Sequence, residues 1–475
     1  MSERPAGDRD GELAALLDAD ALRAWLVEQR WYASKSRGVT AIEPIERLEL
    51  SEELSLVLVQ ARFATGTHEL YQLLLHQRQE APGGQPPPEA VDGAAAAPIA
   101  RRGTLALYDA TAEPQPALEL LARIEACADY RTQTGSFSFR RAGKPSAPLA
   151  PQRIRVIAGE QSNSSIVFDE RLILKLFRKV ESGINPELEM LRFLTAREFP
   201  NIARLHGWFE YEGSALAATL GVAQEFVPDG RDGWELALEE IPGDPERFLA
   251  RLGSLGEVTA QMHDVLASDA GDPAFSPEEP SQEAMSLLTA TVDEDIERIF
   301  LRLPDAEALE PIAGRGQDVR ERLAVRAQLG AGGRQIRIHG DYHLGQTLAT
   351  PRGWVILDFE GEPARPLPER RAKRSPLRDV ASMLRSFAYA ASAVELRHGP
   401  QAAQDFEQRA RERFLERYFA QIDPTLLPPG EAATANMLAI FELEKAIYEL
   451  RYELDNRPDW VRIPVAGIAR LLQDA

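Results

Sequence analysis

The chain has 475 residues, 44% of them hydrophobic and 27% charged, so we expect two or three lobes that each bury a substantial core. Its formal net charge of −20 disfavours nucleic acid as a partner, because the acidic field repels phosphate backbones. No apolar run approaches the length needed to cross a bilayer, and the single cysteine, Cys127, excludes an intramolecular disulfide, so we expect neither membrane insertion nor a disulfide scaffold.

Residues 1–100 are predicted to form a small α+β cap domain. The first twenty residues are polar and acidic, unlike a secretory leader, so we expect a cytoplasmic protein. Apolar residues recur at helical spacing over 12–30, and the segments 54–63 and 68–78 have strand patterns. Residues 81–98 are mostly Pro, Gly and Ala, which predicts a mobile loop at the end of the cap.

A β-rich lobe is predicted over 101–228 and a helical lobe over 229–475. Strand-like apolar segments follow one another between residues 154 and 179, and a helical period covers 185–199. Beyond residue 230, long helical periods dominate. The order predicts an α+β protein with a β-rich lobe, a connector and a helical lobe, preceded by the cap.

Polar residues crowd around one short apolar run after residue 338. His339, Asp341 and Gln346 have the spacing H-x-D-x-x-x-x-Q, and Asp358 ends the run "GWVILD". Kinase-type phosphotransferases use such an aspartate to accept the proton of the attacking hydroxyl, and an amide and a second aspartate to hold Mg²⁺. We therefore predict Asp341 as catalytic base, with Gln346 and Asp358 as ligands of Mg²⁺ bound with ATP. Gln346 stands where this pattern expects asparagine, and the alternative is a polar hairpin without a metal.

The strand "LILKLFR" contains one charge, Lys175, among apolar residues. This is the pattern of the lysine that contacts the α- and β-phosphates of ATP, although a solvated lysine is an equal alternative. The helix that follows carries acidic residues in its first turn. We predict Glu189 as the ion-pair partner of Lys175, with Glu187 as the alternative.

Two further segments are candidates for holding the nucleotide. The turn "IAGEQSNSS", which includes Ser162, has small residues that could let backbone N–H groups approach a phosphate, but an ordinary hairpin turn is equally consistent with it. The connector "AQEFVPDG" is expected to bind adenine through backbone groups from Gln224 to Phe226.

With these residues the chain resembles the bacterial maltokinases, in the aminoglycoside-phosphotransferase-like branch of the kinase-like fold. The resemblance is carried by "QRWYASKSR", "INPELEMLRFL", "HGDYHLGQTL", "ILDFEGEPARPLPERRAKRSPLRDVASMLRSFAYAA" and "YELRYELDNRPDWVRIPVAGIARLL". It implies a bilobal protein-kinase-like fold with an N-terminal cap. It also implies ATP-dependent phosphorylation of maltose at the anomeric hydroxyl for α-glucan synthesis, and an association with trehalose synthase.

Other functions stay open beside maltose phosphorylation. Actinobacterial glucosamine kinases share the overall pattern, so glucosamine is the alternative substrate, and a catalytically silent regulatory module is the second alternative. Aminoglycosides are disfavoured because the tract 362–379 is rich in arginine, which would repel cationic drugs. A solvated charged loop is at least as consistent with that tract as a role in binding the substrate.

The sugar is predicted to bind between the catalytic loop and the helix "FELEKAIYELRYELDNRPDW". Tyr448 and Tyr452 share one face of this helix with Arg451 beside them, and Trp460 follows the helix end. Aromatic faces and charged planar groups suit the two sides of a sugar ring, although core packing is the commoner reason for such a pattern.

Further polar residues flank the catalytic loop in sequence. His343, close to the predicted base, is expected to contact a sugar hydroxyl. Asp379 and Arg385 lie on the next helical segment. They could support the loop, but we prefer surface ion pairs for both.

Overall fold

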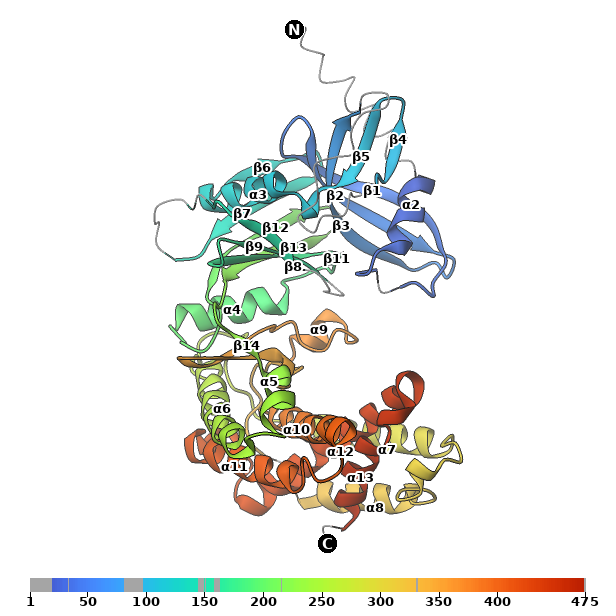
Figure 1. Cartoon of the computed structure of the whole chain (residues 1–475), viewed down its shortest axis with the longest axis vertical. Helices are drawn as coiled ribbons and strands as arrows, with labels where there is room; N and C mark the ends of the chain where they lie inside the picture. Colours follow the sequence, from blue (N-terminus) through green and yellow to red (C-terminus); the bar gives the residue numbers. More distant parts are fainter. Residues whose placement is uncertain are drawn as a thin grey trace. The chain divides into compact units, whose positions relative to one another are not determined.

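The computed structural model describes residues 19–32, 34–80, 97–143, 149, 151–157, 163–214, 216–329 and 332–473. The chain divides into two compact units (Figure 1). The first comprises Met1–Arg192 and Ala203–Pro228, and the second comprises Phe193–Ile202 and Asp229–Ala475. None of the described helices is long and apolar enough to cross a membrane. The predicted mobile loop lies, over 81–96, outside the described residues.

The described part of the first unit contains two antiparallel sheets, of which the first belongs to the cap. Its strand order is β1-β2-β3-β5-β4, and β11 pairs with β3 as well. Its elements are α2 (Ala19–Glu28), β1 (Val39–Glu49), β2 (Leu54–Phe63), β3 (His68–Gln79), β4 (Ala100–Arg102), β5 (Leu105–Asp109) and β11 (Lys179–Val180). The cap sheet thus continues past the predicted boundary at residue 100.

The second sheet of this unit has the order β6-β7-β12-β13-β10-β9-β8 among the described strands. Its elements are β6 (Asp129–Arg131), β7 (Gly135–Arg141), β8 (Ile154–Ile157), β9 (Asn163–Phe168), β10 (Leu172–Phe177), β12 (Leu205–Gly213) and β13 (Ala217–Glu225). Helix α3 (Pro114–Ala126) packs on β7 and β12, and helix α4 (Pro186–Ala196) follows β11.

One apolar core joins the cap sheet to the second sheet, so the predicted boundary at residue 100 does not separate two independent cores. Strand β2 is buried on both faces. Leu56 and Leu58 pack with Phe139 and Phe209 of the second sheet, while Val57 belongs to the cluster beneath α2. A strand buried on both sides has a continuous apolar run instead of an alternation, as "LSLVLV" does.

The second unit is mainly helical. Its helices are α5 (Gly233–Glu240), α6 (Pro245–Leu266), α7 (Gln282–Phe300), α8 (Gly316–Leu329), α9 (Leu367–Arg370), α10 (Leu377–His398), α11 (Phe406–Gln421), α12 (Glu431–Asn456) and α13 (Arg462–Gln473). A small sheet is formed by β14 (Arg231–Asp232), β15 (Thr347–Thr350) and β16 (Gly353–Ile356). Helix α10 packs along α12, and α6 along α11 (Figure 1). A β-rich unit followed by a helical one confirms the predicted α+β class.

Candidate active site

The loop that carries Asp341 is held by a buried carboxylate. Asp379, in the first turn of α10, is 1% exposed and accepts hydrogen bonds from the backbone N–H of His339 (2.8 Å) and of Gly340 (2.9 Å). Its Oδ2 also accepts from Nε2 of buried His263, at 3.2 Å. Burial acts to raise the pKa of Asp379, but these hydrogen bonds and the nearby His263 leave it lowered, so the group is a carboxylate.

Our preferred interpretation of Asp379 and Arg385 as surface residues was therefore wrong. Arg385 is 2% exposed, and its guanidinium binds Glu449 Oε2 at 2.7 and 2.9 Å. Both residues face inward because α10 is buried on most of its length. A buried charge requires a partner, and each of these has one.

His339 connects the catalytic loop to the strand that precedes Asp358. Its Nε2 donates to the carbonyl of Leu357 at 2.8 Å, and its Nδ1 accepts from the backbone N–H of Asp341 at 3.4 Å. The ring is buried and packs against Tyr342 and Phe359. The side chain of His339 thus links the loop of Asp341, the predicted base, to the segment of Asp358, the predicted metal ligand.

His343 presents a hydrogen-bond donor next to Asp341. Its Nδ1 accepts from the backbone N–H of Gly345 at 3.1 Å, so in the neutral ring the hydrogen is on Nε2. Burial is the main cause that lowers the pKa of His343, and His339 and Lys445 add to it, so the ring is neutral at neutral pH. Nε2–H of His343 is then the group that can bind an acceptor oxygen.

The predicted metal ligands lie together. Gln346 Nε2 is 3.1 Å from Asp358 Oδ2, and a half-turn of the amide would put its oxygen at that place. Adjacent ligands of an octahedral Mg²⁺, each at about 2.1 Å, are separated by about 3.0 Å. The two side chains therefore fit the ion. Asp358 has a φ of +60°, a conformation that is costly for a residue with a Cβ and is found at functional sites.

A cavity of about 680 Å³ opens beside Asp341 and His343, and we call it the α12 cavity. Helix α12 contributes one face to it: Lys445, Tyr448, Glu449, Tyr452 and Glu453. Positions i, i+3, i+4, i+7 and i+8 lie on the same side of a helix, so this lining follows from helical geometry. The rest comes from the catalytic loop, from Asp232 and Arg457, and from α5 and α10, which include Trp234, Ser382 and Tyr389.

Two of the predicted sugar contacts are not in the lining of this cavity. Arg451 is exposed, and its guanidinium lies 5.6 Å from the centre of the Tyr448 ring. Arg451 directly precedes Tyr452, about 100° away around the helix axis, and so lies beside Tyr448 at the edge of the lining face. Trp460 instead stacks on Tyr389, with ring centres 6.1 Å apart, and so supports a lining residue from behind.

The carboxylates in the lining are mostly paired already. Glu449 binds Arg385, and Glu453 is bonded to Arg457 (2.6 Å) and to the hydroxyl of Tyr389 (2.9 Å). Asp232 accepts from N–H groups at the start of α5. Asp341 itself lies 3.8 Å from Lys445 Nζ. The cavity is therefore less acidic than its residue types suggest.

In the first unit, Lys175 lies on β10 and makes an ion pair with the first turn of α4. Its Nζ is 2.8 Å from Oε2 of Glu187, which is 1% exposed. This ion pair is with Glu187, the alternative partner. Two residues apart on a helix correspond to about 200° around its axis, so both glutamates cannot face the strand equally.

The other predicted nucleotide residues are partly accounted for. Gln224 is the penultimate residue of β13 and is paired with Ile173 and Leu205. The backbone N–H of Phe226 donates to the carbonyl of Arg171 at 2.9 Å, so this donor is already used and would not reach adenine. Ser162 lies outside the described residues.

Comparison with known proteins identifies the family of this chain. Residues 153–415 match the model of the phosphotransferase enzyme family. The chain belongs to this family. Residues 25–112 of this phosphotransferase match the maltokinase N-terminal cap domain, which confirms the predicted resemblance and the predicted cap. The predicted activity class, an ATP-dependent phosphotransferase that acts on an alcohol group, is confirmed as well.

Relatives of this phosphotransferase include glucosamine kinases. The protein from Streptacidiphilus jiangxiensis is 25% identical over 343 residues, which cover 69% of this chain and 75% of the relative. The protein from Mycolicibacterium smegmatis is 26% identical over 332 residues, covering 67% and 80%. A solved glucosamine kinase in complex with glucosamine, ADP and inorganic phosphate has a TM-score of 0.69 at 18% identity and covers 96% of this chain and 99% of its own. The two share a fold.

Proposed function

We propose that this phosphotransferase is a maltose 1-kinase, which transfers the γ-phosphoryl group of ATP to the anomeric hydroxyl of maltose. The shape of the α12 cavity carries the proposal. Its lining follows α12 from Lys445 to Glu453, about 12 Å at the rise of an α-helix. A disaccharide needs a long site of this kind, whereas a single sugar ring would occupy one end of it. The match to the maltokinase cap supports the same substrate.

The chemistry of the lining suits a neutral sugar. Trp234, Tyr389, Tyr448 and Tyr452 bring aromatic rings to the cavity, and aromatic walls with a few fixed polar groups are typical of small-molecule sites. In our proposal these rings cover the apolar faces of the sugar, and the Nε2–H of His343 binds a hydroxyl close to Asp341.

Glucosamine, the second candidate, has an ammonium group that would need an available carboxylate. The α12 cavity offers exposed Glu235, which makes no ion pair among the described residues, but the carboxylates of α12 are not available. Glu449 and Glu453 are held by Arg385 and Arg457. Lys445 stands beside Asp341 and would repel a second cation there. The observation that favours glucosamine is the function named for the relatives, and their identity to this chain is only 25% and 26%.

For the chemical step, we propose Asp341 as the base that receives the proton of the anomeric hydroxyl. An anomeric hydroxyl is more acidic than an ordinary alcohol, so positioning contributes more than proton abstraction. Lys175, fixed by Glu187, would bind the α- and β-phosphates. Gln346 and Asp358 would hold Mg²⁺, which would neutralise charge on the transferred phosphoryl group.

The test is incubation of the purified chain with Mg-ATP and a panel of sugars, read by phosphorus NMR. We expect a glycosyl-phosphate doublet with maltose, lost in Asp341→Asn and retained in Asp405→Asn, a matched change at an exposed site. A phosphate ester formed only with glucosamine would show that glucosamine is the substrate and that maltose is not. Activity of Asp341→Asn equal to the wild type would instead favour the silent regulatory module.

Two other predictions rest on the family resemblance alone: the association with trehalose synthase and the role in α-glucan synthesis. The predicted cytoplasmic location rests on the polar N-terminal sequence. Co-elution of the two purified proteins in size-exclusion chromatography tests the association with trehalose synthase.

A further inference from the structure

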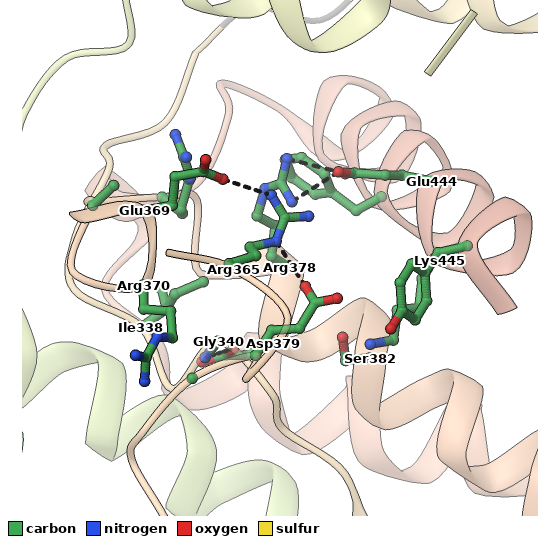
Figure 2. A pocket seen from close by; sticks show the side chains of 16 residues that line it. Ile338, Gly340, Arg365, Glu369, Arg370, Arg378, Asp379, Ser382, Glu444 and Lys445 are labelled. Atoms are coloured by element: carbon green, nitrogen blue, oxygen red, sulfur yellow. Dashed lines mark hydrogen bonds and ion pairs between the residues drawn. The ribbon is translucent and has the colours of Figure 1, made fainter. Parts of the chain in front are cut away.

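The arginine-rich tract 362–379 lines a second pocket over much of its length. This arginine pocket has a volume of about 90 Å³ and includes Arg365, Arg374 and Arg378. Figure 2 labels Arg365 and Arg378 among its lining residues. The tract is fixed because Arg374 and Ile336 exchange backbone hydrogen bonds and because α10 begins immediately afterwards. A charged sequence is not necessarily mobile when both its ends are anchored.

Two of these arginines are already neutralised. The guanidinium of Arg365 binds Glu362 at 2.7 Å and Glu369 at 3.4 Å. Arg378 forms a two-pronged pair with Glu444, at 3.1 and 3.0 Å. Figure 2 shows these pairs across the pocket as dashed lines. None of these carboxylates makes an ion pair with Arg374 in the described part of the chain.

Arg374, unlike Arg365 and Arg378, is not neutralised by an ion pair with any residue that the structure describes. Its side chain is half-buried, and its guanidinium has neither a hydrogen bond nor an ion pair among the described residues. Burial, with Arg378 and Arg365 nearby, lowers the pKa of Arg374. Lys445 lines the same pocket. Glu444 and Glu369 oppose the lowering of the Arg374 pKa but make no ion pair with it. A partly desolvated guanidinium without a directly bound counter-ion is costly, and an anion in the pocket would remove that cost.

We propose that the arginine pocket binds a phosphate-type oxyanion through Arg374, supplied either as inorganic phosphate or as the phosphoryl group of a sugar phosphate. Guanidinium groups bind phosphate oxygens in two-pronged geometry, and the volume is several times what one water molecule needs. The pocket meets the α12 cavity at Ser382, Lys445 and Tyr448, so a sugar phosphate could reach it from there. Gly340 of the catalytic loop lines it too.

The proposal does not depend on the identity of the substrate, because phosphate binding is measured without turnover. Thermal unfolding and calorimetry of the full chain are followed while inorganic phosphate is added at constant ionic strength. We expect a saturable rise of the unfolding midpoint in the wild type. Arg374→Gln should weaken phosphate binding roughly tenfold or more. Arg352→Gln, which removes the same charge from an exposed turn, should bind phosphate like the wild type.

Two further measurements identify where phosphate binds and whether it comes from inorganic phosphate or from a sugar phosphate. Lys175→Met should keep the effect if phosphate binds in the arginine pocket, and should lose it if phosphate binds at the nucleotide lysine, which would overturn the proposal. Glucose 1-phosphate is the second probe. Tighter binding than inorganic phosphate, with the same loss in Arg374→Gln, identifies a sugar phosphate as the source, whereas equal or weaker binding identifies phosphate itself.

Other results would also overturn the proposal. These are a wild type without saturable binding of either probe, or an Arg374→Gln variant that binds phosphate normally. A rise in maltose KM in Arg374→Gln with unchanged phosphate binding would assign the pocket to the sugar instead. Should Arg374→Gln fold poorly, Arg374→Lys keeps the charge without the two-pronged geometry, and we expect intermediate affinity from it.

Discussion

Replacement of Asp379 by asparagine tests whether the buried carboxylate positions the catalytic loop. The change keeps the shape of the side chain but removes its charge and one acceptor oxygen. Asp379 receives hydrogen bonds from two successive backbone N–H groups, those of His339 and Gly340, and from His263. The one oxygen of asparagine can replace only one carboxylate oxygen. Its NH₂ group would then lie against a backbone N–H or an imidazole N–H. Two donors would face each other in a buried site, and neither would have an acceptor.

The expected loss of stability follows from the hydrogen bonds that are lost. A hydrogen bond to a charged group contributes about 1.5–3 kcal/mol, and a buried donor left unpaired costs about 1–3 kcal/mol. We therefore expect Asp379→Asn to lower the free energy of unfolding by about 2–5 kcal/mol. Gly340 directly precedes Asp341, so a shift of the loop moves the base. A misplacement of about 1 Å can cost roughly a hundredfold in rate, and we expect a fall in kcat of that order with a smaller change in KM.

Urea unfolding and steady-state ADP release give the two quantities. Asp405→Asn is the control, because Asp405 is exposed and has a φ of +57°, which asparagine adopts readily. If Asp379→Asn behaved like this control in both assays, the positioning role would be refuted. Lower stability with normal kcat for the folded enzyme would leave Asp379 as a core residue with no part in positioning Asp341.

His343→Asn should keep an acceptor for the N–H of Gly345 but lose the Nε2–H donor, so we expect acceptor KM to rise by roughly fivefold to tenfold at near-normal stability. His343→Gln should instead lose the bond to Gly345 and lower the unfolding midpoint, and an unchanged KM in both variants would exclude a contact with the acceptor. The lowered pKa of His343 means that the unfolded chain takes up this proton first as the pH falls through 6.5, so stability is lost in that direction. Urea unfolding across pH should therefore show a steeper acid-side loss in the wild type than in His343→Asn, with parallel curves above that pH. Asp358→Asn should lower kcat roughly a hundredfold or more and remove the Mg²⁺ dependence of ADP binding in calorimetry, with an unchanged circular dichroism spectrum; normal Mg²⁺-dependent binding would contradict the metal assignment.

Residues close together in sequence were predicted well, because one loop and one hairpin bring them together. His339, Asp341, Gln346 and Asp358 fall within twenty residues, and the structure connects them through short hydrogen bonds. For these residues the sequence spacing was enough to predict that they lie close together, because a hairpin fixes the distance between its ends. The face of α12 was predicted in part for the same reason: Tyr448 and Tyr452 both line the cavity.

Contacts between distant segments could not be predicted from the sequence. Trp234 and Tyr389 reach the α12 cavity only because α5 and α10 pack beside α12. Asp379 was misjudged because an aspartate in a first helical turn is usually a surface residue. What decides its role is the burial of that turn against the catalytic loop, and burial depends on the tertiary fold.

The net charge of −20 describes the surface but is a poor guide to the charge of the ligands. In the α12 cavity, Arg385 and Arg457 neutralise glutamates that would otherwise attract a cation. In the arginine pocket, carboxylates neutralise Arg365 and Arg378 but not Arg374. An acidic protein can therefore offer a sugar site in which most carboxylates are already bonded next to a cationic site for an oxyanion. The charge that a ligand meets is set by which side chains remain unpaired after folding, and pairing is a property of the packed helices.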